Sequence, residues 1–173
     1  MRSLVLLVGL TLPLVAQTGP VNLDFEDSGL DGIPTGWAWN QDRSSLTTVE
    51  TCRRPDSRCA QVRHLGDANP SSIMQSFDAT ALRGKQVRYR AWLQLEAPTL
   101  SQARLFMRVE RAGGMVGFQE YSYGDRIRSR DWTMREIVGT IDEDATRVTI
   151  GLFYSGLGSA YIADAEIIER DGL

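Results

Sequence analysis

The sequence is poor in the residues that most enzymes use for acid–base or nucleophilic chemistry. It contains a single histidine, His64, and two cysteines among 173 residues. It has neither a Gly-x-Ser-x-Gly motif nor a His-Glu-x-x-His motif, and no glycine-rich loop followed by a phosphate-binding lysine. A lone histidine in a strand-like run is more often a structural residue than a base. The sequence therefore predicts no catalytic residue and favours a non-catalytic role.

Lysine is almost absent, and basic residues do not outnumber acidic ones. The 19 basic and 22 acidic residues give a net charge of −3, and Lys85 is the sole lysine. A mildly acidic chain without a basic run argues against nucleic acid or an anionic membrane surface as a partner. The basic residues are nearly all arginine, whose planar guanidinium favours stacked and bidentate contacts.

Long hydrophobic runs are also missing, because no apolar stretch reaches the roughly 20 residues that a membrane-spanning helix needs. The one short run, Leu4–Leu12, follows a charged start at Arg2 and precedes the small residue Ala16. This arrangement is typical of a secretory signal peptide, here residues 1–16. We expect cleavage after Ala16, a mature domain of residues 17–173, and a secreted or periplasmic protein without a membrane span.

The two cysteines, Cys52 and Cys59, bracket the six residues Arg-Arg-Pro-Asp-Ser-Arg. Two cysteines in an exported chain most often pair, so we predict a disulfide between them. A pair of free thiols is the alternative. A zinc site is disfavoured because no second cysteine pair or histidine cluster accompanies them.

No stretch longer than a turn shows helical periodicity. Instead, roughly ten short runs alternate apolar and polar residues between turns, which is typical of an all-β sandwich. The predicted strands are residues 21–26, 46–50, 60–65, 72–78, 86–96, 103–111, 115–123, 132–141, 147–154 and 160–169. The last two are joined by a short glycine-containing loop, which predicts an antiparallel hairpin. We predict a single domain, a two-sheet antiparallel β-sandwich without linkers or repeats.

Several short motifs occur in a recognisable order along the chain. They are Asn22-Leu-Asp-Phe-Glu26, Ile33-Pro-Thr-Gly-Trp37, Leu82-Arg-Gly-Lys85 before a long strand, Asp131-Trp132 and Ala160-Tyr-Ile-Ala-Asp164. Their order resembles that of the galactose-binding-domain-like jelly rolls, a group that includes the carbohydrate-binding modules of bacterial secreted hydrolases. The resemblance implies a jelly-roll sandwich, frequently a structural calcium ion and often glycan binding. The chain departs from the pattern at Ala163, where the family usually has a second aspartate, and we recognise no attached catalytic domain.

The resemblance also implies where calcium would bind, since jelly rolls of this kind assemble the site from the first and last strands. Glu26 ends the first predicted strand and Asp164 lies in the last, so these two are the expected side-chain ligands, together with backbone carbonyl oxygens. The alternative is that both carboxylates are ordinary charges at the ends of strands.

The strand predicted at residues 86–96 indicates a ligand-binding face. Its apolar side must face the core, because the opposite side carries three charges, and Trp92 is therefore displayed outward. An exposed aromatic ring with polar neighbours suits a sugar. If the strand at residues 103–111 joins the same sheet, it adds to this face, and tyrosines before a charged loop supply a rim. The predicted ligand-binding residues are Arg88, Arg90, Trp92, Gln94, Phe106, Arg108, Tyr121 and Tyr123.

Three functions fit these observations. The sequence favours a secreted module that binds a glycan or cell-surface polysaccharide on one sheet face. A structural or protein-interaction sandwich without a sugar site is the first alternative. A small glycoside hydrolase is the second, because that chemistry needs only two suitably spaced carboxylates, which could come from Glu96, Glu110, Glu120 and Asp125.

Overall fold

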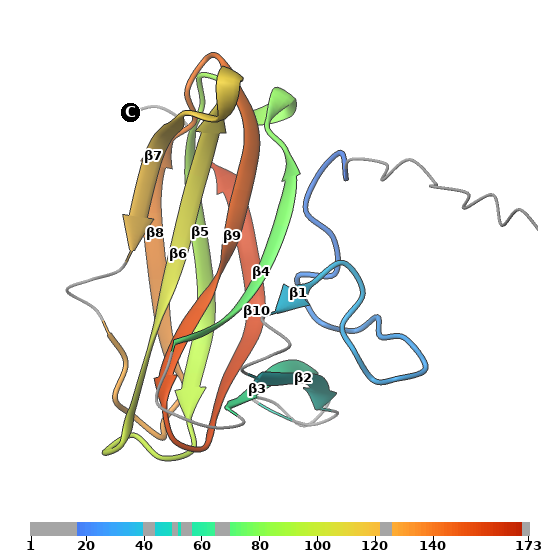
Figure 1. Ribbon diagram of the computed structural model, residues 1–173, viewed down its shortest axis with the longest axis vertical. Helices are drawn as coiled ribbons and strands as arrows, with labels where there is room; N and C mark the ends of the chain where they lie inside the picture. Colours follow the sequence, from blue (N-terminus) through green and yellow to red (C-terminus); the bar gives the residue numbers. More distant parts are fainter. Residues whose placement is uncertain are drawn as a thin grey trace, which may run out of the picture.

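The described part of the chain forms two antiparallel β-sheets packed face to face, as predicted (Figure 1). The computed structural model describes residues 17–39, 44–49, 52, 57–64, 70–121 and 126–170. The predicted signal peptide and Tyr123 lie outside these residues, as does the side chain of Tyr121. Within them, no helix has the length and apolar character of a membrane span.

Each sheet has five strands in the described chain. The first, which we call the β6 sheet, has the order β1 (Ala38–Trp39), β4 (Ser71–Asp78), β9 (Ala145–Gly156), β6 (Ser101–Arg111) and β7 (Val116–Tyr121). The second, the β5 sheet, has the order β2 (Ser44–Val49), β3 (Cys59–His64), β10 (Ser159–Glu169), β5 (Gln86–Leu95) and β8 (Thr133–Thr140). Short 3-10 turns, η1 (Thr80–Leu82) and η2 (Ala112–Gly114), precede β5 and β7. The strands predicted from residue 46 onward are all present, with shifted ends.

The hydrophobic core lies between the two sheets. The apolar side of β5 is buried as predicted, with Val87, Tyr89, Ala91, Leu93 and Leu95 at most 1% exposed. The buried side of β6 adds Ala103, Leu105, Met107 and Val109. Because each strand gives alternate residues to the core, the remaining side chains of both strands form the two outer faces of the sandwich.

The predicted hairpin between residues 147–154 and 160–169 is wrong. Strand β9 lies in the β6 sheet and β10 in the β5 sheet, so the loop between them crosses from one sheet to the other. Gly156 allows this passage, because its φ is 118° and an added Cβ would lie 2.2 Å from the Leu100 carbonyl oxygen. Alternation of apolar and polar residues shows which side chains face the core. The pattern is the same for two strands that pair in one sheet and for two strands that face each other across the core, so it does not distinguish these arrangements.

The strand predicted at residues 21–26 is also wrong, because this segment forms a turn. Asn22 and Phe25 have φ values of 48° and 62°, in the left-handed region. The Phe25 backbone N–H donates to the Asn22 carbonyl oxygen at 3.3 Å, and the Asn22 side-chain amide donates to the Asp27 and Thr35 carbonyl oxygens. Asparagine tolerates this conformation and stabilises turns through such side-chain bonds. The turn buries the Phe25 ring against Trp37, with centroids 5.0 Å apart.

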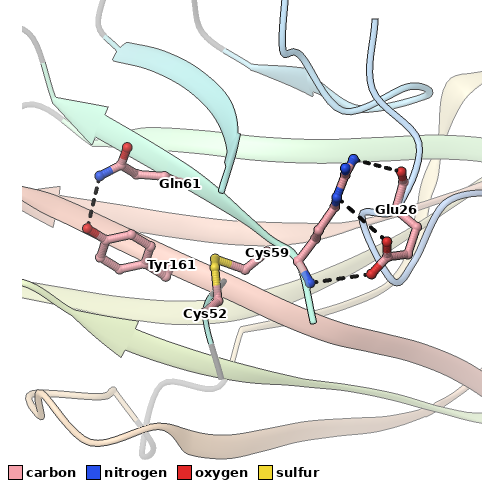
Figure 2. The surroundings of a disulfide bond; sticks show 6 residues. Glu26, Cys52, Cys59, Gln61 and Tyr161 are labelled. Atoms are coloured by element: carbon pink, nitrogen blue, oxygen red, sulfur yellow. Dashed lines mark hydrogen bonds and ion pairs between the residues drawn. A yellow bond between two sulfur atoms is a disulfide. The ribbon is translucent and has the colours of Figure 1, made fainter. Parts of the chain in front are cut away.

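The N-terminal segment is fastened to β3 through Glu26 and Arg58. Figure 2 shows the Glu26 contacts beside the disulfide. The Arg58 backbone N–H donates to Glu26 Oε1 at 3.4 Å, Arg58 Nη1 donates to the Glu26 carbonyl oxygen at 3.1 Å, and Arg58 Nε lies 3.7 Å from Glu26 Oε2. Arg58 directly precedes Cys59, which forms the predicted disulfide with Cys52 at a Cα–Cα distance of 5.8 Å. The disulfide therefore fixes the backbone next to the arginine.

These contacts bear on the predicted calcium ligands. Asp164 lies in a bulge of β10, two residues after the last residue paired with β3, so it belongs to the same end of the β3–β10 pair as Arg58. Arg58 already places a cation on both the carboxylate and the carbonyl oxygen of Glu26. A carboxylate has two oxygens, so it can contact an arginine and a calcium ion together. Calcium binding by Glu26 and Asp164 therefore stays a prediction from the sequence.

Replacing Arg58 should destabilise the fold, because its contacts fasten the N-terminal segment. We expect Arg58→Gln to cost about 1 kcal/mol, a value typical of partly exposed pairs, and to lower the melting temperature by about 3 °C. Differential scanning fluorimetry measures this change. Scans of the unmodified protein in chelator and in millimolar calcium test the calcium prediction, which expects a higher melting temperature with calcium.

Arg63→Gln is the matched control, because Arg63 is an exposed arginine of β3, the strand that Arg58 directly precedes. The melting temperature of this variant should equal that of the unmodified protein. The same melting temperature in chelator and in calcium would remove the prediction of calcium binding at Glu26 and Asp164.

Candidate functional site

The structure divides the predicted ligand-binding residues between opposite faces of the molecule. Four of them, Arg88, Arg90, Trp92 and Gln94, lie on the outer side of β5. Phe106 and Arg108 lie on the outer side of β6, which belongs to the other sheet. The condition that both strands share a sheet is therefore not met. The backbone of Tyr121 pairs with that of Phe106, and Tyr123 falls outside the described residues.

On the outer face of the β5 sheet, much of the polar chemistry is used within the protein. Arg90 forms an ion pair and hydrogen bond with Glu166 on β10. The Gln94 side-chain amide donates to the Arg130 carbonyl oxygen at 2.6 Å. Trp92 is half-buried at the position between Met134 of β8 and Ala163 of β10. A ligand-binding role for this face stays a prediction.

A second group on this face is bonded together in the same way. Gln61 donates through Nε2 to Tyr161 Oη at 2.9 Å, as Figure 2 shows, and to Ser159 Oγ at 3.1 Å. The Trp132 ring meets Tyr161 edge-on, with centroids 6.4 Å apart. Trp132 thus has the packing role that its place beside a turn predicts. These contacts hold the side chains to one another and to the sheet.

On the outer face of the β6 sheet, Phe106 supports a second aromatic ring. Phe106 is only 5% exposed, and its ring packs on Phe153 of β9 with centroids 4.5 Å apart. Gly151 makes room for it, because an added Cβ there would lie 2.6 Å from the Phe106 ring and 2.2 Å from the Ile73 carbonyl oxygen. Phe106 is therefore a packing residue, and Phe153 is the half-buried ring beside solvent.

A pocket of about 120 Å³ opens beside Phe153, where β6 begins and β9 ends. These two strand ends lie at the lower end of the molecule in Figure 1. Its lining residues are Pro70, Gln102, Ala103, Arg104, Arg126, Phe153, Tyr154 and Ser155. The Arg104 guanidinium carbon lies 5.8 Å from the centroid of the Phe153 ring. Burial, with Glu96 nearby, raises the pKa of Tyr154 to about 12, so its hydroxyl stays protonated.

Hydrogen bonds fix the polar side chains of this pocket, which we call the Phe153 pocket. Gln102 accepts from Arg126 Nη1 at 2.9 Å and donates through Nε2 to Ser155 Oγ at 3.1 Å. Gln102 thereby links the loop after β7 to the end of β9. An amide held at both ends keeps a defined orientation, which a binding site requires of its polar groups.

The segment that carries Arg126 is itself attached to β6. Ile127 is 1% exposed, donates to the Ala103 carbonyl oxygen at 2.9 Å and accepts from the Ala103 N–H at 3.4 Å. Because successive side chains of an extended segment point to opposite sides, Arg126 and Arg128 both project away from the core. Arg128 lines a shallower depression that shares Gln102, Arg126 and Ser155 with the Phe153 pocket.

This set of groups suits a polyhydroxylated ligand better than it suits catalysis. An aromatic ring, an amide, a hydroxyl and guanidinium groups meet in one depression, whereas no carboxylate or histidine is among its described lining residues. Of the carboxylates considered for glycoside hydrolysis, Glu110 is held between Arg108 at 3.3 Å and Arg147 at 3.5 Å. Asp125 lies outside the described residues.

The described residues also contain no group of three or more histidine, cysteine, aspartate or glutamate side chains that could hold a metal ion. Glu26 is engaged by Arg58, as described above. Calcium binding by Glu26 and Asp164 stays a prediction from the sequence, without support from the described contacts.

Sequence reasoning named none of the residues that line the pocket, including Gln102, Arg126 and Phe153, on which the geometry of the pocket depends. For Phe153 a signal existed, because the alternation of residues 147–154 places it opposite the apolar set that faces the core. For Arg126 the signal was weaker. The pattern Arg-Ile-Arg at residues 126–128, within a charged loop, indicates an apolar residue that faces the core between two arginines that point outward. Neither pattern says that both segments meet at one end of the β6 sheet.

Comparison with known proteins gives matches in structure and none in sequence. No protein-family model and no curated protein sequence matches the chain. Its structure is similar to the C-terminal family 22 carbohydrate-binding module of Clostridium thermocellum xylanase 10B, with a TM-score of 0.61 and 13% identity over 90% of this chain and 99% of that module. A family 61 module in complex with β-1,4-galactotriose gives a TM-score of 0.60 and 14% identity over 90% and 100%.

A longer structure matches as well. It contains the N-terminal family 22 module and the catalytic module of the same Clostridium thermocellum xylanase, complexed with xylohexaose, with a TM-score of 0.64 and 15% identity. The match covers 79% of this chain and 26% of that one, so the chain spans about a quarter of the longer protein. At these identities the likeness establishes the fold. The chain therefore has the β-sandwich fold of family 22 and family 61 carbohydrate-binding modules, in agreement with the resemblance in its sequence.

Proposed function

We propose that the protein is a non-catalytic module that binds a glycan in the Phe153 pocket, on the outer face of the β6 sheet. The observation that carries the proposal is the meeting of Phe153 with the hydrogen-bonded pair of Gln102 and Arg126 in one depression. An aromatic ring offers a surface for the C–H face of a sugar, and the amide and guanidinium groups beside it can bond the hydroxyls.

The Phe153 pocket is the better candidate of the two outer faces for a physical reason. On the β5 sheet, the groups predicted to bind a ligand, Arg90 and Gln94, are held by Glu166 and by the Arg130 carbonyl oxygen. Glu166 also neutralises the charge of Arg90, whereas no carboxylate is among the described lining residues of the Phe153 pocket. At the Phe153 pocket, the Gln102 bonds orient the lining groups around a space of about 120 Å³.

The fold supports this proposal without naming a ligand. The similar modules described above belong to a xylanase and to a complex with galactotriose. The disulfide between Cys52 and Cys59 suits an oxidising compartment. We therefore propose that the protein acts outside the cytoplasm, where a glycan or cell-surface polysaccharide is its partner. A structural sandwich without a sugar site remains the alternative that the following experiment decides.

Phe153→Leu should weaken glycan binding about tenfold, which corresponds to about 1.4 kcal/mol, because leucine keeps the apolar contact with Phe106 but has no flat ring. Affinity gel electrophoresis and titration calorimetry against xylan, β-1,4-galactan and polygalacturonate would measure the change. Circular dichroism should show the same fold for the variant and the unmodified protein.

Trp92→Leu is the matched variant on the opposite face, and glycan affinity should survive it. Loss of binding in Trp92→Leu, with Phe153→Leu unaffected and both folded, would move the site to the β5 sheet and reject the Phe153 pocket. Absence of binding to every polysaccharide of the panel by the unmodified protein would favour the structural alternative.

A further inference from the structure

The Phe153 pocket and its neighbouring depression are rich in arginine. Arg104 and Arg126 line the pocket, and Arg126 and Arg128 line the depression that adjoins it. Neither lining contains a carboxylate among the described residues. This concentration of positive charge is local, because the whole chain carries a net charge of −3.

Six basic residues elsewhere in the described chain form ion pairs with described carboxylates. The ion pairs are Arg58 with Glu26, Lys85 with Glu169, Arg90 with Glu166, Arg108 and Arg147 with Glu110, and Arg111 with Asp144. Arg126 and Arg128, by contrast, form no ion pair with any described residue. Two guanidinium groups with no described carboxylate beside them raise the local positive potential, and an anion placed between them relieves it.

The backbone geometry holds both arginines toward the same space. Ile127 is buried between them and bonded to Ala103 through both its N–H and its carbonyl group, so the two flanking side chains project outward together. Gln102 accepts a hydrogen bond from one nitrogen of Arg126, Nη1. A guanidinium has five N–H donors in a planar fork, so most of those of Arg126 remain for a ligand.

We propose that the glycan bound here is anionic, with a carboxylate or sulfate group that contacts Arg126 and Arg128 while a sugar ring lies beside Phe153. The inference rests on the proposed function and specifies its ligand class. A guanidinium binds a carboxylate or sulfate through two parallel N–H···O bonds, which are stronger than bonds to a neutral hydroxyl. A neutral polysaccharide would leave the two arginines without a counter-charge and would bind more weakly.

The test compares glycans that differ only in charge. Polygalacturonate and its fully methyl-esterified form share a backbone and differ in the carboxylate, and dextran sulfate and dextran differ in the sulfate. Titration calorimetry should give at least tenfold tighter binding to the charged member of one pair. The pair that shows the preference identifies carboxylate or sulfate as the group recognised. The preference should shrink as salt rises from 50 to 500 mM, because screening weakens charge interactions.

Three arginine variants then locate the contact. Arg126→Gln and Arg128→Gln should each weaken binding of the charged glycan about tenfold, in the range for hydrogen bonds to charged groups. Arg128 lies outside the Phe153 pocket, so Arg128→Gln should leave binding of a neutral glycan within about twofold. Arg63→Gln removes the same charge from the β5 sheet and should leave both unchanged. Equal losses in all three variants would indicate a general charge effect and would reject the site.

The outcomes separate this inference from the proposed function. Equal binding of charged and neutral glycans, weakened by Phe153→Leu and unaffected by Arg128→Gln, would overturn the anionic ligand and leave glycan binding intact. Failure of every glycan to bind would overturn both proposals.

Discussion

The contact between the apolar sides of β5 and β6 across the core determines where this protein can bind anything. Both strands alternate strictly, and their inner residues, from Val87 to Leu95 and from Ala103 to Val109, are almost completely buried. Burial stabilises the fold by about 25 cal/mol per Å² of apolar surface, so this contact contributes to the stability of the core. It also forces the other half of each strand outward. The core therefore determines which residues lie on each outer face, and these residues cannot change sides unless the core unfolds.

The two faces differ in how their polar groups are used. On the β5 sheet, ion pairs and amide bonds join neighbouring strands, as between Arg90 and Glu166. On the β6 sheet, Gly151 has no side chain, so the Phe106 ring packs close to its backbone. The Phe153 ring packs on Phe106 and lines the Phe153 pocket. The first arrangement stabilises a surface, and the second leaves space for a ligand. This difference in the use of polar groups, and not the presence of aromatic residues, makes the outer face of the β6 sheet the better candidate for ligand binding.

The disulfide and the Arg58–Glu26 contact have a structural role. They fasten a segment that has little regular secondary structure to the edge of the β5 sheet. Gln75 does the same on the other sheet, because its buried side-chain amide exchanges hydrogen bonds with both the N–H and the carbonyl oxygen of Val21. The N-terminal segment is thereby held against the sandwich from two sides by polar contacts and by the buried Phe25 ring.

Much of the fold could be predicted from the sequence, because alternation is a local property. The strand positions after residue 46 and the buried side of β5 follow from it. Alternation does not show to which sheet a strand belongs. For this reason the predicted hairpin between β9 and β10 was wrong, and the condition that Trp92 and Phe106 lie in one sheet was not met. The turn at Asn22 was hidden because Val21, Leu23 and Phe25 alternate like a strand, although Asn22 and Phe25 adopt positive φ. The Phe153 pocket needed three distant segments to meet, which no local pattern specifies.

The central claim is that a glycan binds beside Phe153 on the β6 sheet. The most direct measurement is a ¹⁵N-labelled NMR titration with trigalacturonate and with xylohexaose. The account predicts that a saturable shift of backbone amide signals will concentrate at residues 102–104, 126–128 and 153–155 with at least one of these ligands. Shifts centred on β5, β8 and β10, or no saturable shift with either ligand, would contradict it.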